Sequence, residues 1–168
     1  MPDAMNENVK TVHDVGHGPV VERFVEDYAV GETQEAGPVT VTAEEIISFA
    51  ERYDPLPMHL SVADGQASVH DSLIASGVLT IALKQRMIMS VERNPAIIGA
   101  VRIDEQQFLK PVRPGDELSM FQTCTGARNS QSRPDRGLVF WDFELRNQKG
   151  EIVFSSKDTV MVRRRPVN

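Results

Sequence analysis

The spacing of apolar positions predicts a helix that begins just after Thr42. Its apolar residues recur at intervals of three and four, as one face of a helix requires: Ile46, Phe49, Ala50 and Tyr53. Thr42 has the position of the N-cap, and Glu45 that of the residue whose side chain reaches back in a capping box. Pro55 and Pro57 end the helix because neither can donate the next backbone hydrogen bond. We expect residues 54–59 to be extended or turned.

A second helix is predicted over residues 78–89. This segment is apolar almost all round its first turns, which is typical of a helix buried at the centre of a fold. Ser76 is a plausible N-cap, and Gly77 would be the first helical residue. The first N–H groups of a helix lack intrahelical partners and lie at the positive end of its dipole. Gly77 would therefore offer an unshielded N–H donor.

After residue 95 the pattern changes to the period of two that is typical of strands. Extended segments are predicted at residues 97–108, 118–127, 139–146 and 151–162, with hairpin chemistry at residues 147–150. Residues 24–37 read as a loop and turn bounded by short extended pieces. Helices followed by a run of antiparallel strands predict an α+β fold in which a sheet wraps around the apolar helix.

Length and composition narrow the function classes. The 168 residues suit one domain, which we place at residues 21–168 behind a polar N-terminal arm at residues 1–20. A net charge of −6 argues against a nucleic-acid partner, and no apolar stretch is long enough to span a membrane. The N-terminus has no export signal, so we expect a cytoplasmic protein. The single cysteine, Cys124, excludes an internal disulfide and a four-cysteine zinc site.

The candidate chemistry rests on Asp54 and His59. The sequence has no dinucleotide fingerprint, P-loop, metalloprotease helix or nucleophile elbow, and we expect neither a metal nor a cofactor. Asp54 and His59 lie five residues apart on a connection stiffened by two prolines. Both could point into one cleft, hold a water between them and exchange its protons. An Asp after a helix is more often a cap, however, and a His there is more often on the surface.

A family resemblance strengthens this interpretation. YDPLPMHL (residues 53–60), LIASG (residues 73–77) and FLKPVRPGD (residues 108–116) resemble the motifs of the MaoC-like dehydratases, a group of hot-dog-fold proteins that includes R-specific enoyl-CoA hydratases. The resemblance covers most of the chain. It implies a hot-dog fold, assembly into a homodimer or larger homo-oligomer, and an acyl-CoA or acyl-carrier-protein thioester as substrate.

The resemblance also implies roles for individual residues. Asp54 and His59 match the pair that activates water for addition to a 2-enoyl thioester, or removes water from a 3-hydroxyacyl thioester. The Gly77 N–H matches the donor to the thioester oxygen, where negative charge develops. Further residues are implied to border the substrate: Ser76, His70, Gln85 and Pro57.

Four positions depart from the family pattern. Leu56 stands where Asn is usual, Ser61 where Asp is frequent, Ser76 where His is common, and Gln85 where the hydratases have a serine. The identity of the acyl group in the substrate is therefore left open. Two alternatives also stay open: a thioesterase in which Asp54 activates water at the thioester carbonyl, and a non-catalytic acyl-thioester-binding protein.

Overall fold

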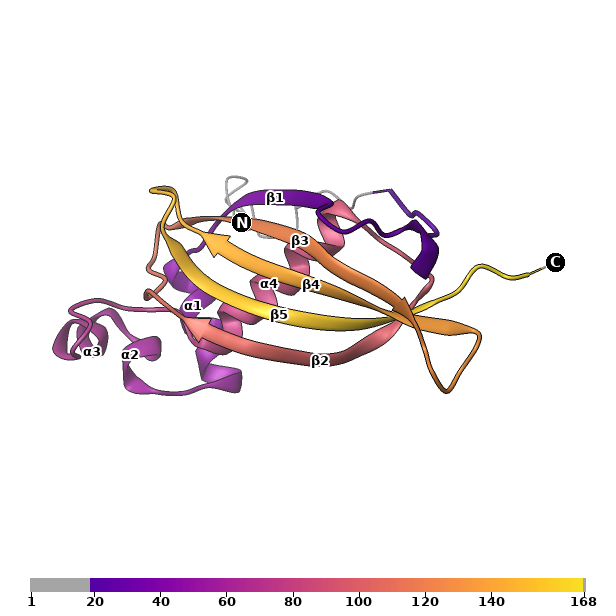
Figure 1. Cartoon of the computed structure of the whole chain (residues 1–168). Coiled ribbons are helices and arrows are strands. Elements are labelled where there is room, and N and C mark those ends of the chain that lie inside the picture. Colours follow the sequence, from indigo (N-terminus) through magenta and orange to yellow (C-terminus); the bar gives the residue numbers. More distant parts are fainter. Residues whose placement is uncertain (1–18, 168) are drawn as a thin grey trace, which may run out of the picture.

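Five antiparallel strands curve around one long helix in the computed structural model, which describes residues 19–167 (Figure 1). The strands are β1 (Thr33–Thr40), β2 (Ile97–Phe108), β3 (Glu117–Asn129), β4 (Arg136–Arg146) and β5 (Ile152–Arg163). They are arranged in the order β1-β3-β4-β5-β2, so that β1 and β2 form the two edges. This architecture confirms the predicted α+β fold, with its sheet wrapped around an apolar helix.

The central helix, α4 (Gly77–Val91), packs its buried residues against the concave face of the sheet (Figure 1). Leu79, Leu83 and Met87 are at most 3% exposed and recur every fourth residue. The opposite side is different, because Val78 is 51% and Met89 39% exposed. A single sheet covers only one side of a helix, so α4 is central to the fold, as expected, but its second side is open in the single chain.

The first helix, α1 (Ala43–Tyr53), begins as predicted, since Thr42 Oγ1 accepts a hydrogen bond from the Glu45 N–H at 3.1 Å. The second half of the expected capping box is absent. Glu45 Oε2 is buried without a hydrogen-bond partner among the described residues. Burial raises the pKa of this carboxyl, and the charge of Arg86 partly opposes the shift.

The connection from α1 to α4 contains two short helices that the sequence pattern did not predict. They are α2 (Pro57–Leu60) and α3 (Val62–Ala67). Pro57 is the first residue of α2, a position where a helix needs no N–H donor. Pro57 therefore ends one helix and begins another, and the expectation of an extended or turned segment over residues 54–59 is wrong at its second half.

The N-terminal region also differs from the prediction. Residues 24–37 were expected to form a loop and turn bounded by short extended pieces, whereas they contain a short 3-10 helix, η2 (Val25–Asp27), and the first part of the eight-residue strand β1. β1 pairs with β3, and this long-range contact organises a segment whose own pattern is weak. Of the predicted arm, residues 1–18 lie outside the described residues. Within residues 19–167, no helix is both long and apolar enough to cross a membrane.

Candidate active site

The two candidate catalytic residues lie close together in space. Asp54 is the C-cap of α1, where its N–H donates to Ala50 O at 3.0 Å, and His59 belongs to α2 and is 5% exposed. His59 Nε2 is 3.8 Å from Asp54 Oδ2. The turn that joins α1 to α2 thus directs both side chains toward one point.

The hydrogen bond on the other ring nitrogen defines the tautomer of His59. Its Nδ1 lies 2.7 Å from Ile74 O, and because a carbonyl oxygen only accepts, we assign the proton to Nδ1. In the neutral ring, Nε2 is then the unprotonated nitrogen, and it faces Asp54. A separation of 3.8 Å is too long for a direct hydrogen bond. It suits a water that lies about 2.8 Å from each atom.

Ser76 joins this pair to the N-terminus of α4. Its hydroxyl donates to Asp54 Oδ2 at 2.5 Å and accepts from the Val78 N–H at 3.1 Å, and the residue is fully buried. Gly77 follows as the first helical residue, so its N–H has no partner within the helix. A Cβ on Gly77 would come within 2.8 Å of Phe108 Cε1. A glycine here lets the Phe108 ring and the helix end approach closely.

The other predicted substrate-binding residues are more dispersed. Pro57 is exposed at the start of α2. His70 lies half-buried between α3 and α4, where its carbonyl accepts from Arg113 Nη2 at 3.2 Å. Gln85 lies about 12 Å along the axis of α4 from Gly77, at eight residues and 1.5 Å per residue. The structure therefore brings Ser76 and Gly77 to the pair and places Gln85 beside a separate cavity.

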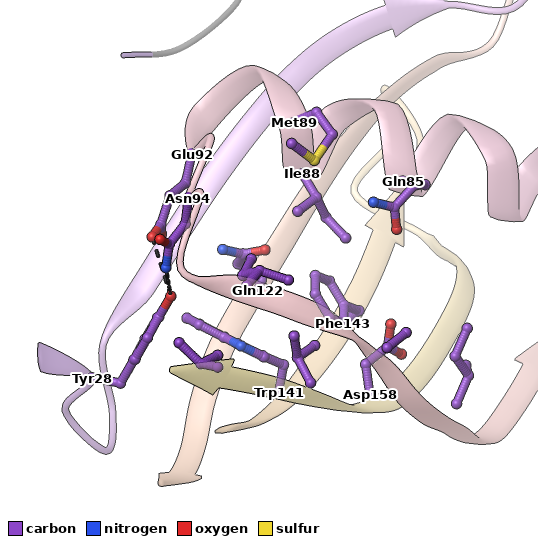
Figure 2. A pocket seen from close by; sticks show the side chains of 15 residues that line it. Tyr28, Gln85, Ile88, Met89, Glu92, Asn94, Gln122, Trp141, Phe143 and Asp158 are labelled. Carbon is purple, nitrogen blue, oxygen red and sulfur yellow. Dashed lines mark hydrogen bonds between the residues drawn. The ribbon is translucent and has the colours of Figure 1, made fainter. Parts of the chain in front are cut away.

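This cavity encloses about 260 Å³ between the second half of α4 and strands β2, β3, β4 and β5 (Figure 2). Ile88, Trp141 and Val160 are among its apolar lining residues, whereas Gln122 and Asp158 are polar. No local sequence pattern predicts this cavity, because its lining residues are far apart in the chain. Gln122 carries a usable signal, because it occupies an inward-facing position on β3 between the buried Met120 and Cys124.

A buried ion pair lies beside the cavity and was also missed. Lys84 is 1% exposed, and its Nζ donates to Asp158 Oδ2 at 2.6 Å and to Ser156 Oγ at 3.2 Å. The same ammonium lies 4.5 Å from the centre of the Phe143 ring. Lys84 follows Leu83 on the buried side of α4, and its acceptors come from β5. Only the packing of helix on sheet reveals that the charge is internal.

The far end of the cavity is closed by a network around Glu92. Arg23 Nη1 and Gln34 Nε2 donate to Glu92 Oε2, at 2.9 and 3.1 Å, and the Tyr28 hydroxyl donates to Oε1 at 3.4 Å. Burial raises the pKa of Tyr28, and the charge of Glu92 adds to this shift. The phenol therefore stays a neutral donor. Within residues 19–167, no cluster of three or more His, Cys, Asp or Glu side chains could hold a metal ion.

Comparison with known proteins identifies the family. A sequence model described as "MaoC like domain" matches residues 25–137. The chain belongs to this family. A solved MaoC-like dehydratase from Rhodospirillum rubrum is 37% identical, with a TM-score of 0.78 over 86% of this chain and 99% of its own. The (R)-hydratase from A. caviae involved in PHA biosynthesis is 19% identical, covers 84% of this chain and 99% of its own, has a TM-score of 0.66 and shows the shared fold.

A mesaconyl-CoA hydratase from Cereibacter sphaeroides is 31% identical over 151 residues, which are 85% of this chain. The match spans only 42% of that relative, so this MaoC-like chain is less than half its length. At the level of the family, these findings support a hydratase on a hot-dog fold.

Proposed function

We propose that this MaoC-like protein adds water across the double bond of a 2-enoyl thioester, or removes it in the reverse direction. The observation that carries the proposal is the gap of 3.8 Å between His59 Nε2 and Asp54 Oδ2. Two proton acceptors at this separation hold a water by both of its hydrogens and leave an oxygen lone pair directed away from them. The mesaconyl-CoA hydratase relative supports the same class of reaction.

The proposed reaction proceeds in two proton transfers. His59 Nε2 takes a proton from the water while the water oxygen bonds to C3 of the enoyl group, and the C2–C3 π electrons move toward the thioester oxygen. The His59 imidazolium then returns this proton to C2, directly or after passing it to the Asp54 carboxylate. The product is a 3-hydroxyacyl thioester, and the site returns to its starting charge.

The N-terminus of α4 supplies the electrostatic part of this proposal. The Gly77 N–H donates to the thioester oxygen as negative charge develops there, and Ser76 connects the same helix end to Asp54 at 2.5 Å. A preorganised donor of this kind contributes about 3–4 kcal/mol to transition-state stabilisation in enzymes where one has been removed.

The proposed assembly is a homodimer or larger oligomer formed through the edge strand β2. β2 has twelve residues without proline, and only its β5 side is paired. β1, the other edge, is shorter and contains Pro38, which cannot donate to a ladder. Ile98 and Val101 of β2 are 43% and 51% exposed. A long unpaired edge with exposed apolar side chains in its first half favours pairing with a second strand, and a second copy of this chain would supply one.

The test is hydration of crotonyl-CoA, followed as loss of enoyl absorbance. We expect Asp54→Asn and His59→Ala each to lower kcat/KM at least about a hundredfold, because each removes one of the two groups that exchange protons with the water. Asp71→Asn is the matched control, since Asp71 is exposed and its backbone (φ 52°) suits asparagine. Release of CoA thiol without loss of enoyl absorbance would indicate a thioesterase instead, and binding without turnover on a panel of branched and carboxylated enoyl-CoAs would indicate a binding protein.

A further inference from the structure

One buried hydrogen-bond acceptor in the cavity has no partner. Gln122 is 3% exposed, and its Oε1 forms no hydrogen bond with any described residue. Its Nε2 donates to Gln34 Oε1. In Figure 2 the Gln122 nitrogen lies on the side of Glu92, whereas the oxygen faces the interior of the cavity beneath Ile88.

The neighbouring network decides which end of the Gln122 amide is free. Gln34 Nε2 donates to the Glu92 carboxylate at 3.1 Å, so the Gln34 oxygen must face Gln122. A carbonyl oxygen needs a donor, and Gln122 therefore has to present its nitrogen there. Reversing the Gln122 amide would place two oxygens against each other. The unpartnered atom is thus an acceptor and not a donor.

The other polar groups deep in the cavity are already satisfied. The two oxygens of Asp158 accept from Lys84 and Ser156, at 2.6 and 2.7 Å. Asn94 donates to Arg23 O and to the Tyr28 hydroxyl, and its own oxygen accepts from two backbone N–H groups. No lysine or arginine lines the cavity. A ligand group that enters therefore meets a free acceptor, two carboxylates and apolar walls, but no cation.

The cavity lies where the tail of a substrate would arrive. Gln85 and Met89 of α4 and Ile103 of β2 are exposed to solvent and also line the cavity, so they form its mouth. The mouth is about 12 Å from Gly77 along α4. β2 runs beside this path and ends at Phe108, which contacts Gly77. A thioester with its carbonyl at the Gly77 N–H would reach the cavity with a medium-length acyl chain.

We propose that the cavity receives the far end of the acyl chain and that Gln122 makes it selective for a chain that carries a hydroxyl group there. This inference rests on the proposed function for its reaction, but not for its binding site. A hydroxyl donates to Gln122 Oε1, whereas an alkyl end leaves that acceptor desolvated and unpaired. A carboxylate end is disfavoured, because it would lose its hydration where Gln122 offers only an acceptor oxygen and the nearby cations, Arg23 and Lys84, are already paired with Glu92 and Asp158.

The first test compares kcat/KM for hydration of matched enoyl-CoA pairs, from hexenoyl to dodecenoyl, with and without a terminal hydroxyl. The best hydroxylated member should exceed its alkyl counterpart about tenfold, and the carboxylated counterpart should be the poorest. Gln122→Met keeps the length of the side chain and should remove this preference. Thr123→Val makes a similar polar-to-apolar change on the next residue of β3, which lies outside the cavity lining, and should retain it. If the parent protein gives the same kcat/KM for the hydroxylated and the alkyl member of each pair, the inference is overturned.

The second test needs no turnover. Trp141 is the single tryptophan of the chain and lines the cavity, so its fluorescence reports occupancy. Saturated ω-hydroxydecanoyl-CoA should bind about tenfold more tightly than decanoyl-CoA, which cannot be hydrated either. This difference in a protein that hydrates no enoyl-CoA would overturn the proposed function and keep the cavity assignment. Equal binding of the two would overturn the cavity assignment, even if Gln122→Met fails to fold.

Discussion

At the scale of single residues, burial gives polar side chains very different roles. His59 and Lys84 are at most 5% exposed. One nitrogen of the His59 ring is bonded to Ile74 O, and the other lies 3.8 Å from Asp54 Oδ2. The Lys84 ammonium instead donates to Asp158 and Ser156 inside the fold. Residue type alone does not separate a reactive group from a structural one, whereas the partner atoms do.

The Lys84–Asp158 pair leads to a stability prediction. Lys84→Met leaves the Asp158 carboxylate buried with only the Ser156 hydroxyl, and we expect it to cost about 3–5 kcal/mol of unfolding free energy. The double variant Lys84→Met/Asp158→Asn should lose less than the sum of the two single variants, since it removes both charges together. Urea titration measures all three, with Lys149→Met on the exposed hairpin as control. A loss under about 1 kcal/mol in Lys84→Met would mean that the pair is solvated.

At the scale of elements, local capping signals determine where some helices begin, and tertiary contacts position others. The N-cap residues Thr42 and Ser76 begin α1 and α4 as their sequences indicate. The short helices α2 and α3 have no periodicity of their own, and close packing holds them in place. Leu73, which precedes α4, lies directly against Gly65, where any side chain would clash with its backbone. This contact folds the connection back and brings Ile74 to His59.

The start of α1 gives a pH-dependent prediction. Burial raises the folded-state pKa of Glu45 above its unfolded value of about 4.3. Its protonated form therefore stabilises the fold below that pH, and the contribution is lost as the pH rises through the folded-state pKa. At neutral pH the ionised carboxylate destabilises the protein, so Glu45→Gln should raise Tm at about pH 7 and leave it unchanged near pH 3. Thermal unfolding at both values measures this, and Glu44→Gln on the exposed side of the same turn is the control. A lower Tm for Glu45→Gln at neutral pH would contradict the assignment.

At the scale of the whole molecule, the two sides of α4 and the two edges of the sheet are unequal. The sheet covers one side of α4 and leaves Val78 and Met89 exposed. β2 is an edge strand of the sheet, and one of its edges is unpaired. The cavity mouth lies between these same two elements. A second copy paired along β2 would therefore extend the sheet and also border the path to the cavity.

The oligomer prediction follows from this arrangement. Ile98→Lys/Val101→Lys places two charges on the unpaired edge strand and should convert the dimer into a monomer, with hydration activity falling in parallel. Size-exclusion chromatography with light scattering gives the mass. Thr125→Lys adds a charge at an exposed position of β3 and should leave the mass unchanged. A parent protein that is monomeric yet fully active would refute the proposed assembly.

Much of the fold could be predicted from the sequence because hydrophobic periodicity and helix caps depend only on neighbouring residues. The period of 3.6 over α1 and α4, the period of two over β3 and β4, and the caps at Thr42 and Ser76 each depend on neighbouring residues. Asp54, His59 and Gly77 could be named because the short motifs that contain them resemble those of the MaoC-like family, and their catalytic roles remain predictions. β1 is stabilised by pairing with β3, about eighty to ninety residues away in sequence, whereas α2 and α3 carry local signals that the periodicity argument missed: Pro57 at the start of α2, and Ser61, which accepts from the Asp64 N–H at the start of α3.

Sequence by itself thus determined the α+β class, the central helix and the residues that face one another near its N-terminus. Only the tertiary structure decided that Lys84 is internal, that α4 is open on one side, and that Gln122 points an unpaired oxygen into a cavity. The physical reason is that burial and hydrogen-bond partnership are properties of pairs of groups. Such pairs here join residues as far apart as Lys84 and Asp158, or Gln34 and Gln122, which no local pattern connects.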